Sequence, residues 1–239
     1  VREAANGEDF LARVKAQTGL DVQLLTGAEE GRLIYRAVRE VVDLGHGAAA
    51  IVDVGGGSTE WISTLDGEIG QVASLTLGSL RCANGLRGDP PTAASVEKLR
   101  RRIQKRLEKV IPQRAGTPVE RLVATSGTAV CCADLVDFFA GRDWKDASAA
   151  LREVRLKDLA QLVERLRPLP RPALADLPPV GVPRSESLLA GAVLLHELAS
   201  HAGVDRFQVS GQALREGLVL AALGQPIPAA REPEDLRRR

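Results

Sequence analysis

The stretch from Ile51 to Glu60 constrains the fold of this chain more than any other part of its sequence. It is a short apolar, β-branched run that ends on Asp53 and continues with three consecutive glycines, Ser58, Thr59 and Glu60. Glycines lack side chains, so the backbone N–H groups of such a loop can close around an anion. The order therefore predicts a buried strand followed by a phosphate-binding loop. A β-hairpin with a glycine bulge is the alternative interpretation.

The loop and the acids beside it supply candidate ligands for phosphate and for a metal ion. The candidate phosphate-binding residues offer amide or hydroxyl donors, and they are Gly55, Gly56, Gly57 and Ser58. Asp53 and Glu60 supply carboxylate oxygens, and Mg²⁺ binds proteins through one or two carboxylates together with substrate phosphates. We therefore expect Mg²⁺ as the cofactor, with Asp53 and Glu60 as its ligands.

Bulk composition excludes several classes of partner. The chain has 239 residues with 32 basic and 31 acidic side chains, so it has no overall field for gripping nucleic acid or an anionic membrane. No run approaches 18 uncharged apolar residues. Three cysteines, two of them adjacent, do not form a disulfide framework. We expect a cytoplasmic protein with no nucleic-acid and no membrane partner. Because it lacks methionine and begins at Val1, we also expect that it is part of a longer reading frame.

Alternation of strands and helices predicts an α/β fold. Three expected strands end in similar glycine turns, which are Asp53-Val54-Gly55, Thr125-Ser126-Gly127 and Val209-Ser210-Gly211. In α/β sheets, ligands bind beyond the carboxyl ends of the strands. Three such turns facing one cleft suit a ligand with several phosphates. We therefore add Ser126 and Gly127 to the candidate phosphate-binding residues.

The remaining elements are predicted from the periodicity of apolar residues and from turn and helix-end residues. Residues 61–65 and 69–77 are expected to pair through the Asp66-Gly67 turn, and residues 21–25 are expected to form a short strand. Apolar residues at helical spacing predict helices near residues 10–18, 29–44, 92–111, 130–135, 156–166, 185–198 and 213–223.

Taken in order along the chain, several motifs resemble one family. They are Gly27-Ala-Glu-Glu-Gly-Arg-Leu-Ile-Tyr35, Asp53-Val-Gly-Gly-Gly-Ser-Thr-Glu60, Leu77-Gly78 with Arg81, Asp89-Pro-Pro91, Ala124-Thr-Ser-Gly127 and Leu214-Arg-Glu-Gly217. The resemblance is to exopolyphosphatases and guanosine pentaphosphate phosphatases. It implies an α/β fold of the actin-like ATPase (ribonuclease H-like) type, with mixed sheets and flanking helices.

The resemblance also implies a division of the chain. Members of the family carry a first phosphate loop on an opening hairpin, which we expect to be missing upstream of Val1. Residues 1–45 would then be the remainder of the first actin-like subdomain. Residues 46–225 would form the second subdomain with helical insertions, and residues 226–239 a flexible tail. Whether a chain without the first loop is active is left open.

Roles for single residues are implied by the same resemblance. Glu30 matches the acid thought to position or activate the attacking water, and Arg2 matches an arginine that binds the scissile phosphate. Asp53 and Glu60 match acids linked to the metal. The glycine loop matches the second phosphate loop, and Ser126 with Gly127 matches a glycine turn in the other half of the cleft.

The implied activity is that of a phosphohydrolase. It would release terminal phosphate from inorganic polyphosphate or from guanosine pentaphosphate (pppGpp) by Mg²⁺-assisted in-line attack of water. These two molecules are the expected partners, and the resemblance admits a homodimer. Two alternatives stay open, namely an ATP-dependent small-molecule kinase of the same fold and a non-catalytic nucleotide or alarmone sensor.

Overall fold

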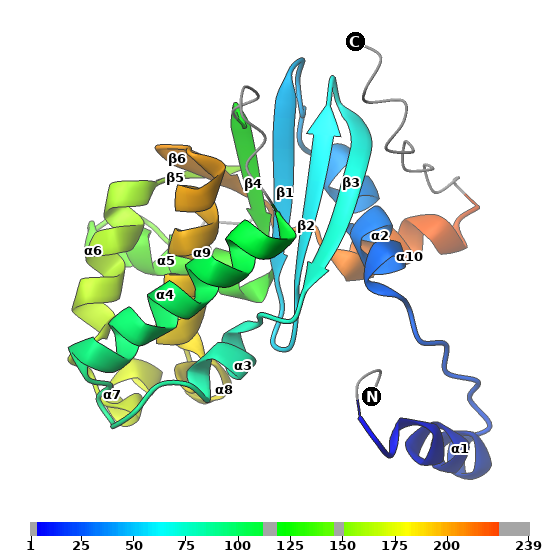
Figure 1. Ribbon diagram of the computed structural model, residues 1–239, viewed down its shortest axis with the longest axis horizontal. Coiled ribbons are helices and arrows are strands. Elements are labelled where there is room, and N and C mark those ends of the chain that lie inside the picture. The colour runs from blue at the N-terminus through cyan, green and yellow to red at the C-terminus, as the bar shows by residue number, and fades with distance from the viewer. Residues whose placement is uncertain (1–3, 112–118, 146–150, 225–239) are drawn as a thin grey trace.

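A six-stranded mixed sheet forms the centre of the molecule (Figure 1). The computed structural model describes residues 4–111, 119–145 and 151–224. The strand order is β3-β2-β1-β4-β6-β5. The bounds are β1 Ala48–Val54, β2 Thr59–Leu65, β3 Glu68–Leu75, β4 Arg121–Thr125, β5 Arg152–Arg155 and β6 Arg206–Val209. Strands β1, β4 and β6 run parallel to one another, so the carboxyl ends of these strands meet at one edge as expected.

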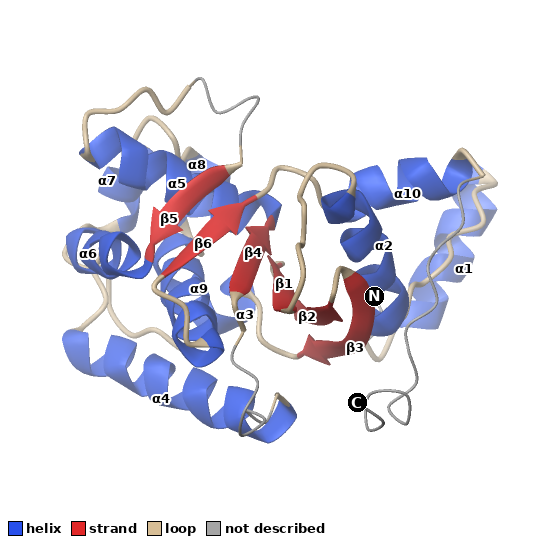
Figure 2. Cartoon of the chain, turned by 90° about the horizontal axis from the view of Figure 1, so that it is seen from above, coloured by secondary structure: helices blue, strands red, loops and turns tan. Residues whose placement is uncertain are grey.

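Helices cover both faces of this sheet (Figure 2). On one face, α2 (Gly27–Arg39) packs against β2, β3 and α10 (Leu214–Ala222). The opposite face is covered mainly by α5 and α9, and α4 and α6 pack against α9. The bounds of the remaining helices are α1 Gly7–Thr18, α3 Ser79–Ala83, α4 Ala93–Val110, α5 Ser126–Phe139, α6 Leu156–Leu166, α7 Arg171–Ala175, α8 Val182–Ser185 and α9 Leu188–Ala202. None of these helices in the described ranges is both long and apolar enough to cross a membrane.

The alternation of side chains along the strands produces two apolar cores. Ile51 and Ile62 face α2, together with Ile34 and Val38 of that helix. Val52, on the other face of the same strand, belongs to the larger core beneath α4, α5, α6 and α9. Successive strand residues point to opposite faces, so a strand buried on both sides must be apolar at nearly every position. The all-buried run from residue 49 to 54 fits this requirement, and Asp53 is the polar exception.

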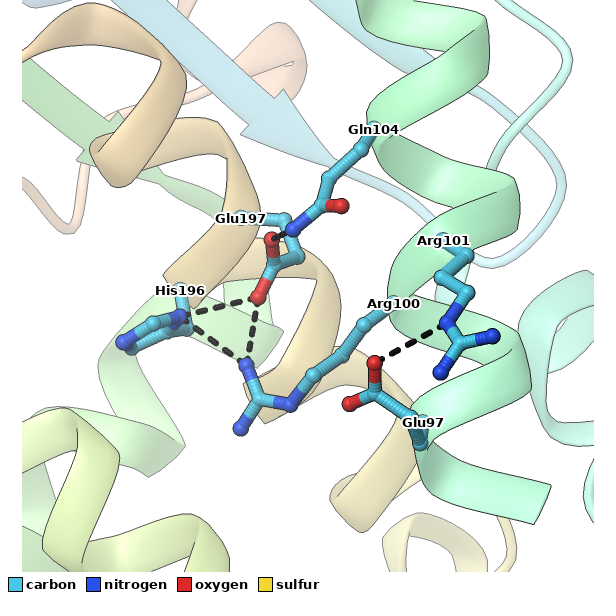
Figure 3. Close-up of polar contacts among 6 residues, drawn as sticks. All are labelled: Glu97, Arg100, Arg101, Gln104, His196 and Glu197. Atoms are coloured by element: carbon cyan, nitrogen blue, oxygen red, sulfur yellow. Dashed lines mark hydrogen bonds and ion pairs between the residues drawn. The ribbon is translucent and has the colours of Figure 1, made fainter. Parts of the chain in front are cut away.

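A buried polar cluster joins α4 to α9 on the larger core's outer side (Figure 3). Glu197 is 4% exposed; it accepts hydrogen bonds from Arg100 and, at 2.7 Å, from Gln104. His196 Nδ1 lies 3.0 Å from Glu197 Oε1. Burial alone would raise the pKa of Glu197, but the hydrogen bonds from these three partners lower it. Glu97 and Arg101 pair on the exposed side of α4 and take no part in this cluster.

Two expectations about the elements are wrong or incomplete. Residues 21–25 form no strand; they are an irregular, mostly exposed segment between α1 and α2. An alternating pattern makes a strand only where a partner strand is available, and none pairs with this segment among the described residues. Strand β5 was not expected, because Arg-Glu-Val-Arg offers a single apolar side chain; it pairs with β6 at the edge of the sheet.

The expected division of the chain at residue 45 stays a prediction. Helix α2, which lies before this boundary, packs against β3 and α10, which lie after it. Helix α1 lies apart from the sheet in both views, at the end of the irregular segment (Figures 1 and 2). The expected tail at 226–239 lies outside the described residues.

Candidate active site

Four polar side chains form a row across the sheet near the carboxyl end of β1. Asp53 is directly opposite Glu60 in β2 and Thr125 in β4, and Glu60 is directly opposite Ser74 in β3. Directly opposed residues point to the same face, with Cβ atoms about 5 Å apart. We call these four residues, Ser74, Glu60, Asp53 and Thr125, the polar row. It lies at the end of the apolar core that α2 covers, where the strands stop.

The first turn of α2 lies against this row. A Cβ atom on Gly27 would be 2.4 Å from Ser74 Cβ, and one on Gly31 would be 2.4 Å from Val72 Cγ1. Only glycine therefore permits this approach of helix to sheet. Glu29 closes the start of the helix, because its carboxylate accepts from the Thr26 amide at 2.7 Å. The neighbouring acid, Glu30, instead lies where its charge acts on both Asp53 and Glu60.

Burial perturbs the two carboxyl groups of the polar row. Asp53 is 7% exposed and Glu60 is 4% exposed. Burial raises the pKa of Asp53 to about 6 and the pKa of Glu60 to about 7, and the charge of Glu30 contributes to both increases. A hydrogen bond from Ser74 Oγ to Glu60 Oε1, 2.9 Å long, opposes the increase at Glu60. Neither acid forms an ion pair with a Lys, Arg or His of the described residues.

This donor set fits Mg²⁺ better than it fits a structural metal. Asp53 and Glu60 are hard oxygen donors held side by side by the strand register. Within the described ranges, no group of three or more His, Cys, Asp or Glu residues is arranged to hold a metal ion. Zinc in proteins requires three or four such ligands, whereas Mg²⁺ keeps waters and takes one or two carboxylates plus phosphate oxygens. Asp53 and Glu60 would therefore hold the ion together with its substrate.

The glycine loop joins β1 to β2, so the hairpin interpretation describes its connectivity correctly. The Gly55 amide donates to the Ser58 carbonyl at 3.0 Å and closes the turn. The carbonyls of Gly55 and Gly56 accept from amides at the start of α3, and the Gly57 carbonyl accepts from Arg81 Nε at 3.0 Å. No hydrogen bond among the described residues uses the amides of Gly56, Gly57 or Ser58. These amides are the donors that a phosphate-binding loop requires.

A second turn lies next to this loop, between β4 and α5. Ser126 has a φ of 84°, which is unusual for a residue other than glycine, and its hydroxyl donates to the Val54 carbonyl at 2.8 Å. The turn is thereby tied to the end of β1. A cavity of about 220 Å³ lies between the two turns; its lining includes Gly55, Gly56, Ser126, Gly127 and Arg184.

The predicted site residues therefore fall into two adjoining groups. Gly55, Gly56, Ser126 and Gly127 line the cavity, whereas Asp53 and Glu60 lie in the polar row and are not among its lining residues. The glycine loop adjoins both groups. It links the strand of Asp53 to the strand of Glu60, and its residues Gly55 and Gly56 line the cavity. Gly57 and Ser58 lie in the same loop. Arg2 lies outside the described residues.

Sequence reasoning missed Ser74, which donates to Glu60. The Asp66-Gly67 turn alone would place Ala73 opposite Glu60. However, the pairing is irregular between two pairs, Ile62 with Val72 and Thr64 with Ile69. Between them β3 has two residues, Gly70 and Gln71, where β2 has only Ser63. This β-bulge shifts the register by one and turns Ser74 to the face of Glu60. Thr26, the N-cap of α2, was also missed, although the pattern Thr-x-x-Glu before a helix is a known start signal.

Comparison with known proteins places this geometry in a family. The profile of the Ppx/GppA phosphatase family matches residues 1–225. The chain belongs to the Ppx/GppA phosphatase family. Exopolyphosphatase 1 of Mycobacterium tuberculosis (strain ATCC 25618 / H37Rv) is 33% identical over 226 residues, which cover 93% of this chain and 64% of that protein. Exopolyphosphatase 2 of the same strain is 32% identical over 240 residues and is covered to 72%. The chain thus spans less than two thirds of the first of these Ppx/GppA relatives.

Solved structures agree on the fold. The crystal structure of the Aquifex aeolicus Ppx/GppA family member superposes with a TM-score of 0.78 at 27% identity, covering 93% of this chain and 71% of that one. An exopolyphosphatase from Cytophaga hutchinsonii gives a TM-score of 0.82 at 22% identity, covering 95% and 74%, and supports the fold alone. The mixed sheet with its flanking helices is therefore the actin-like ATPase fold of Ppx/GppA proteins, as the family resemblance implied.

Proposed function

We propose that this protein is a phosphohydrolase that releases terminal phosphate from inorganic polyphosphate, or from pppGpp, by Mg²⁺-assisted in-line attack of water. Two observations on the described residues together carry the proposal. The carboxylates of Asp53 and Glu60 are buried without a counter-ion, and the amides of Gly56, Gly57 and Ser58 in the adjoining loop make no hydrogen bonds. Two relatives of the chain are named exopolyphosphatases, and this supports the choice of a phosphoanhydride as substrate.

Each group has a role that its surroundings support. The amides of Gly56, Gly57 and Ser58 would bind phosphate oxygens of the chain end, and Ser126 and Gly127 would bind from the second turn. Bound between Asp53 and Glu60, Mg²⁺ would neutralise charge that develops on the transferred phosphoryl group. Glu30 would orient the attacking water and accept its proton, and Arg2 would bind the scissile phosphate. Positioning and electrostatics supply most of the rate in phosphoryl transfer.

The location and assembly of the protein are part of the proposal. All three cysteines, Cys82, Cys131 and Cys132, are unpaired and buried, which suits a reducing compartment such as the cytoplasm. A homodimer stays a prediction. The kinase and sensor alternatives have no observation in their favour; they are outcomes of the experiment below.

Replacement of neighbouring acids on α2 tests the proposal. Glu30→Gln, made in the whole protein that contains this chain, is expected to reduce phosphate release from long-chain polyphosphate by about 10² to 10⁴, because it removes the group that takes the proton. The measurement is phosphate release against Mg²⁺ concentration, with polyphosphate and pppGpp as parallel substrates.

Glu29→Gln is the matched control, since Glu29 serves the cap of the same helix. Because glutamine also serves at this position of a capping box, the variant is expected to fold like the wild type and to retain most of the rate. An unimpaired Glu30→Gln enzyme would exclude the proposed role of Glu30. Binding of either ligand by the wild type without phosphate release would favour the sensor, and phosphate transfer from ATP to an alcohol or acid would favour the kinase.

A further inference from the structure

The buried carboxylate of Glu60 depends on a hydroxyl from the neighbouring strand. Ser74 Oγ donates to Glu60 Oε1 at 2.9 Å, and the strand register places the two residues directly opposite each other. Glu60 is 4% exposed and pairs with no cation in the described part of the chain. A buried carboxylate that lacks a counter-ion is held in place by the hydrogen bonds it accepts. The orientation of Glu60 is therefore set in part from β3.

Ser74 also determines how close α2 can approach. The position of a Cβ atom on Gly27 would be 2.4 Å from Ser74 Cβ and 2.7 Å from Ser74 Oγ. The side chain at position 74 must therefore be small. Alanine would satisfy that packing requirement equally well, so packing alone does not explain a hydroxyl at this position. The hydroxyl has a polar role, and it donates to Glu60.

We propose that Ser74 is a positioning residue of the active site, whose hydroxyl fixes the Glu60 carboxylate beside Asp53 for a divalent cation. This inference rests on the proposed metal role of Asp53 and Glu60. Partners that orient metal-binding carboxylates are known to change metal affinity by about 10- to 100-fold when removed. Ser74 does not touch the reacting atoms; it acts through Glu60.

A mutant cycle tests the proposal. Ser74→Ala removes the hydroxyl and keeps the small side chain that Gly27 requires. We expect it to weaken Mg²⁺ binding about tenfold, measured by titration calorimetry with and without imidodiphosphate. In phosphate-release assays the apparent Mg²⁺ constant should increase by a similar factor, while kcat at saturating Mg²⁺ should change less than about twofold. In a Glu60→Gln background, Ser74→Ala should have no further effect on Mg²⁺ binding.

Ser63→Ala is the matched control. Ser63 is also a strand serine; its hydroxyl accepts one hydrogen bond, 3.2 Å long, from Trp61 Nε1. Its loss should leave Mg²⁺ affinity unchanged. The inference is overturned if Ser74→Ala binds Mg²⁺ like the wild type, if Ser63→Ala loses as much affinity, or if the loss persists in the Glu60→Gln background. It is also overturned if the wild type binds no Mg²⁺ under either condition. The proposed function fails separately, if the expected calorimetric pattern is found but no phosphate is released.

Discussion

At the scale of single residues, glycines of the site are required for different reasons. Gly78 is packed against the glycine loop: a Cβ atom there would be 2.3 Å from the Gly56 carbonyl oxygen and 2.5 Å from the Gly57 nitrogen. A Cβ atom on Gly57 would have no neighbouring atom within 4 Å, so nothing in the described fold excludes a side chain there. We infer that Gly78 shapes the loop, whereas Gly57 leaves room for a ligand.

This difference gives a paired prediction. Gly57→Ala is expected to keep the free energy of unfolding within about 0.5 kcal/mol of the wild type and to weaken the binding of imidodiphosphate, because its methyl group occupies the approach to the amides. Gly78→Ala is expected to lower the free energy of unfolding by about 1 to 3 kcal/mol, because backbone atoms must move. Urea unfolding and calorimetry measure both quantities. Unchanged ligand binding by Gly57→Ala would contradict the first expectation.

At the scale of elements, α2 is held by close contacts on two sides. Gly27 and Gly31 bring it onto the sheet, and Gly217 brings α10 onto α2: a Cβ atom at position 217 would be 2.2 Å from the Leu33 carbonyl oxygen. Helix α10 comes from near the end of the described chain, so the helix that carries Glu30 is fixed by distant parts of the sequence. The position of Glu30 thus depends on tertiary packing.

Gly217→Ala is expected to destabilise the protein by about 1 to 3 kcal/mol, because the added methyl group meets a backbone carbonyl. The sign is informative, since alanine normally stabilises a helix relative to glycine. Gly211→Ala provides the control, because no atom lies within 4 Å of its Cβ position. Urea unfolding measures both variants. Equal free energies of unfolding for the two variants would show that α10 can move away from α2 without loss of stability.

Most elements of the fold could be predicted from the sequence, because apolar periodicity and glycine turns mark their limits. Asp53 and Glu60 could be placed together for the same reason, since a short loop joins their strands. Ser74 could not, because a bulge in β3 changes the register and nothing in the local sequence marks it. Strand β5 could not either, since its pairing with β6 supplies what its polar sequence lacks.

At the scale of the whole molecule, the sheet holds two buried acidic residues side by side at one end of its strands. The folded protein holds protons on Asp53 and Glu60 more tightly than the unfolded chain does, since their pKa values increase from 3.8 to about 6 and from 4.5 to about 7. At pH values between the unfolded and the folded pKa, the folded state binds more protons than the unfolded state. These two groups therefore make the free energy of unfolding decrease as pH increases from about 4 to 8. Glu197, whose pKa is lowered, contributes in the opposite direction.

The comparison with Glu60→Gln isolates this effect. Without Mg²⁺, the variant is expected to be more stable than the wild type at pH 8 by about 1 to 3 kcal/mol, and the difference should shrink towards pH 5, where the wild-type carboxyl group is protonated. Adding Mg²⁺ at pH 8 should stabilise the wild type and not the variant. Thermal unfolding across pH checks both. A difference independent of pH would show that Glu60 is not perturbed as described.

The bulge between β2 and β3 makes spacing as important as residue identity in this part of the chain. Loss of Gly70 or Gln71 would remove the bulge and leave Ser74 opposite Glu60, whereas closing the bulge without a deletion would place Ala73 opposite Glu60 and turn the Ser74 hydroxyl to the other face. Natural variants of this protein should therefore lose a residue from β3 at the bulge more readily than between Val72 and Ser74, where such a loss would place Leu75 opposite Glu60 if the bulge remained.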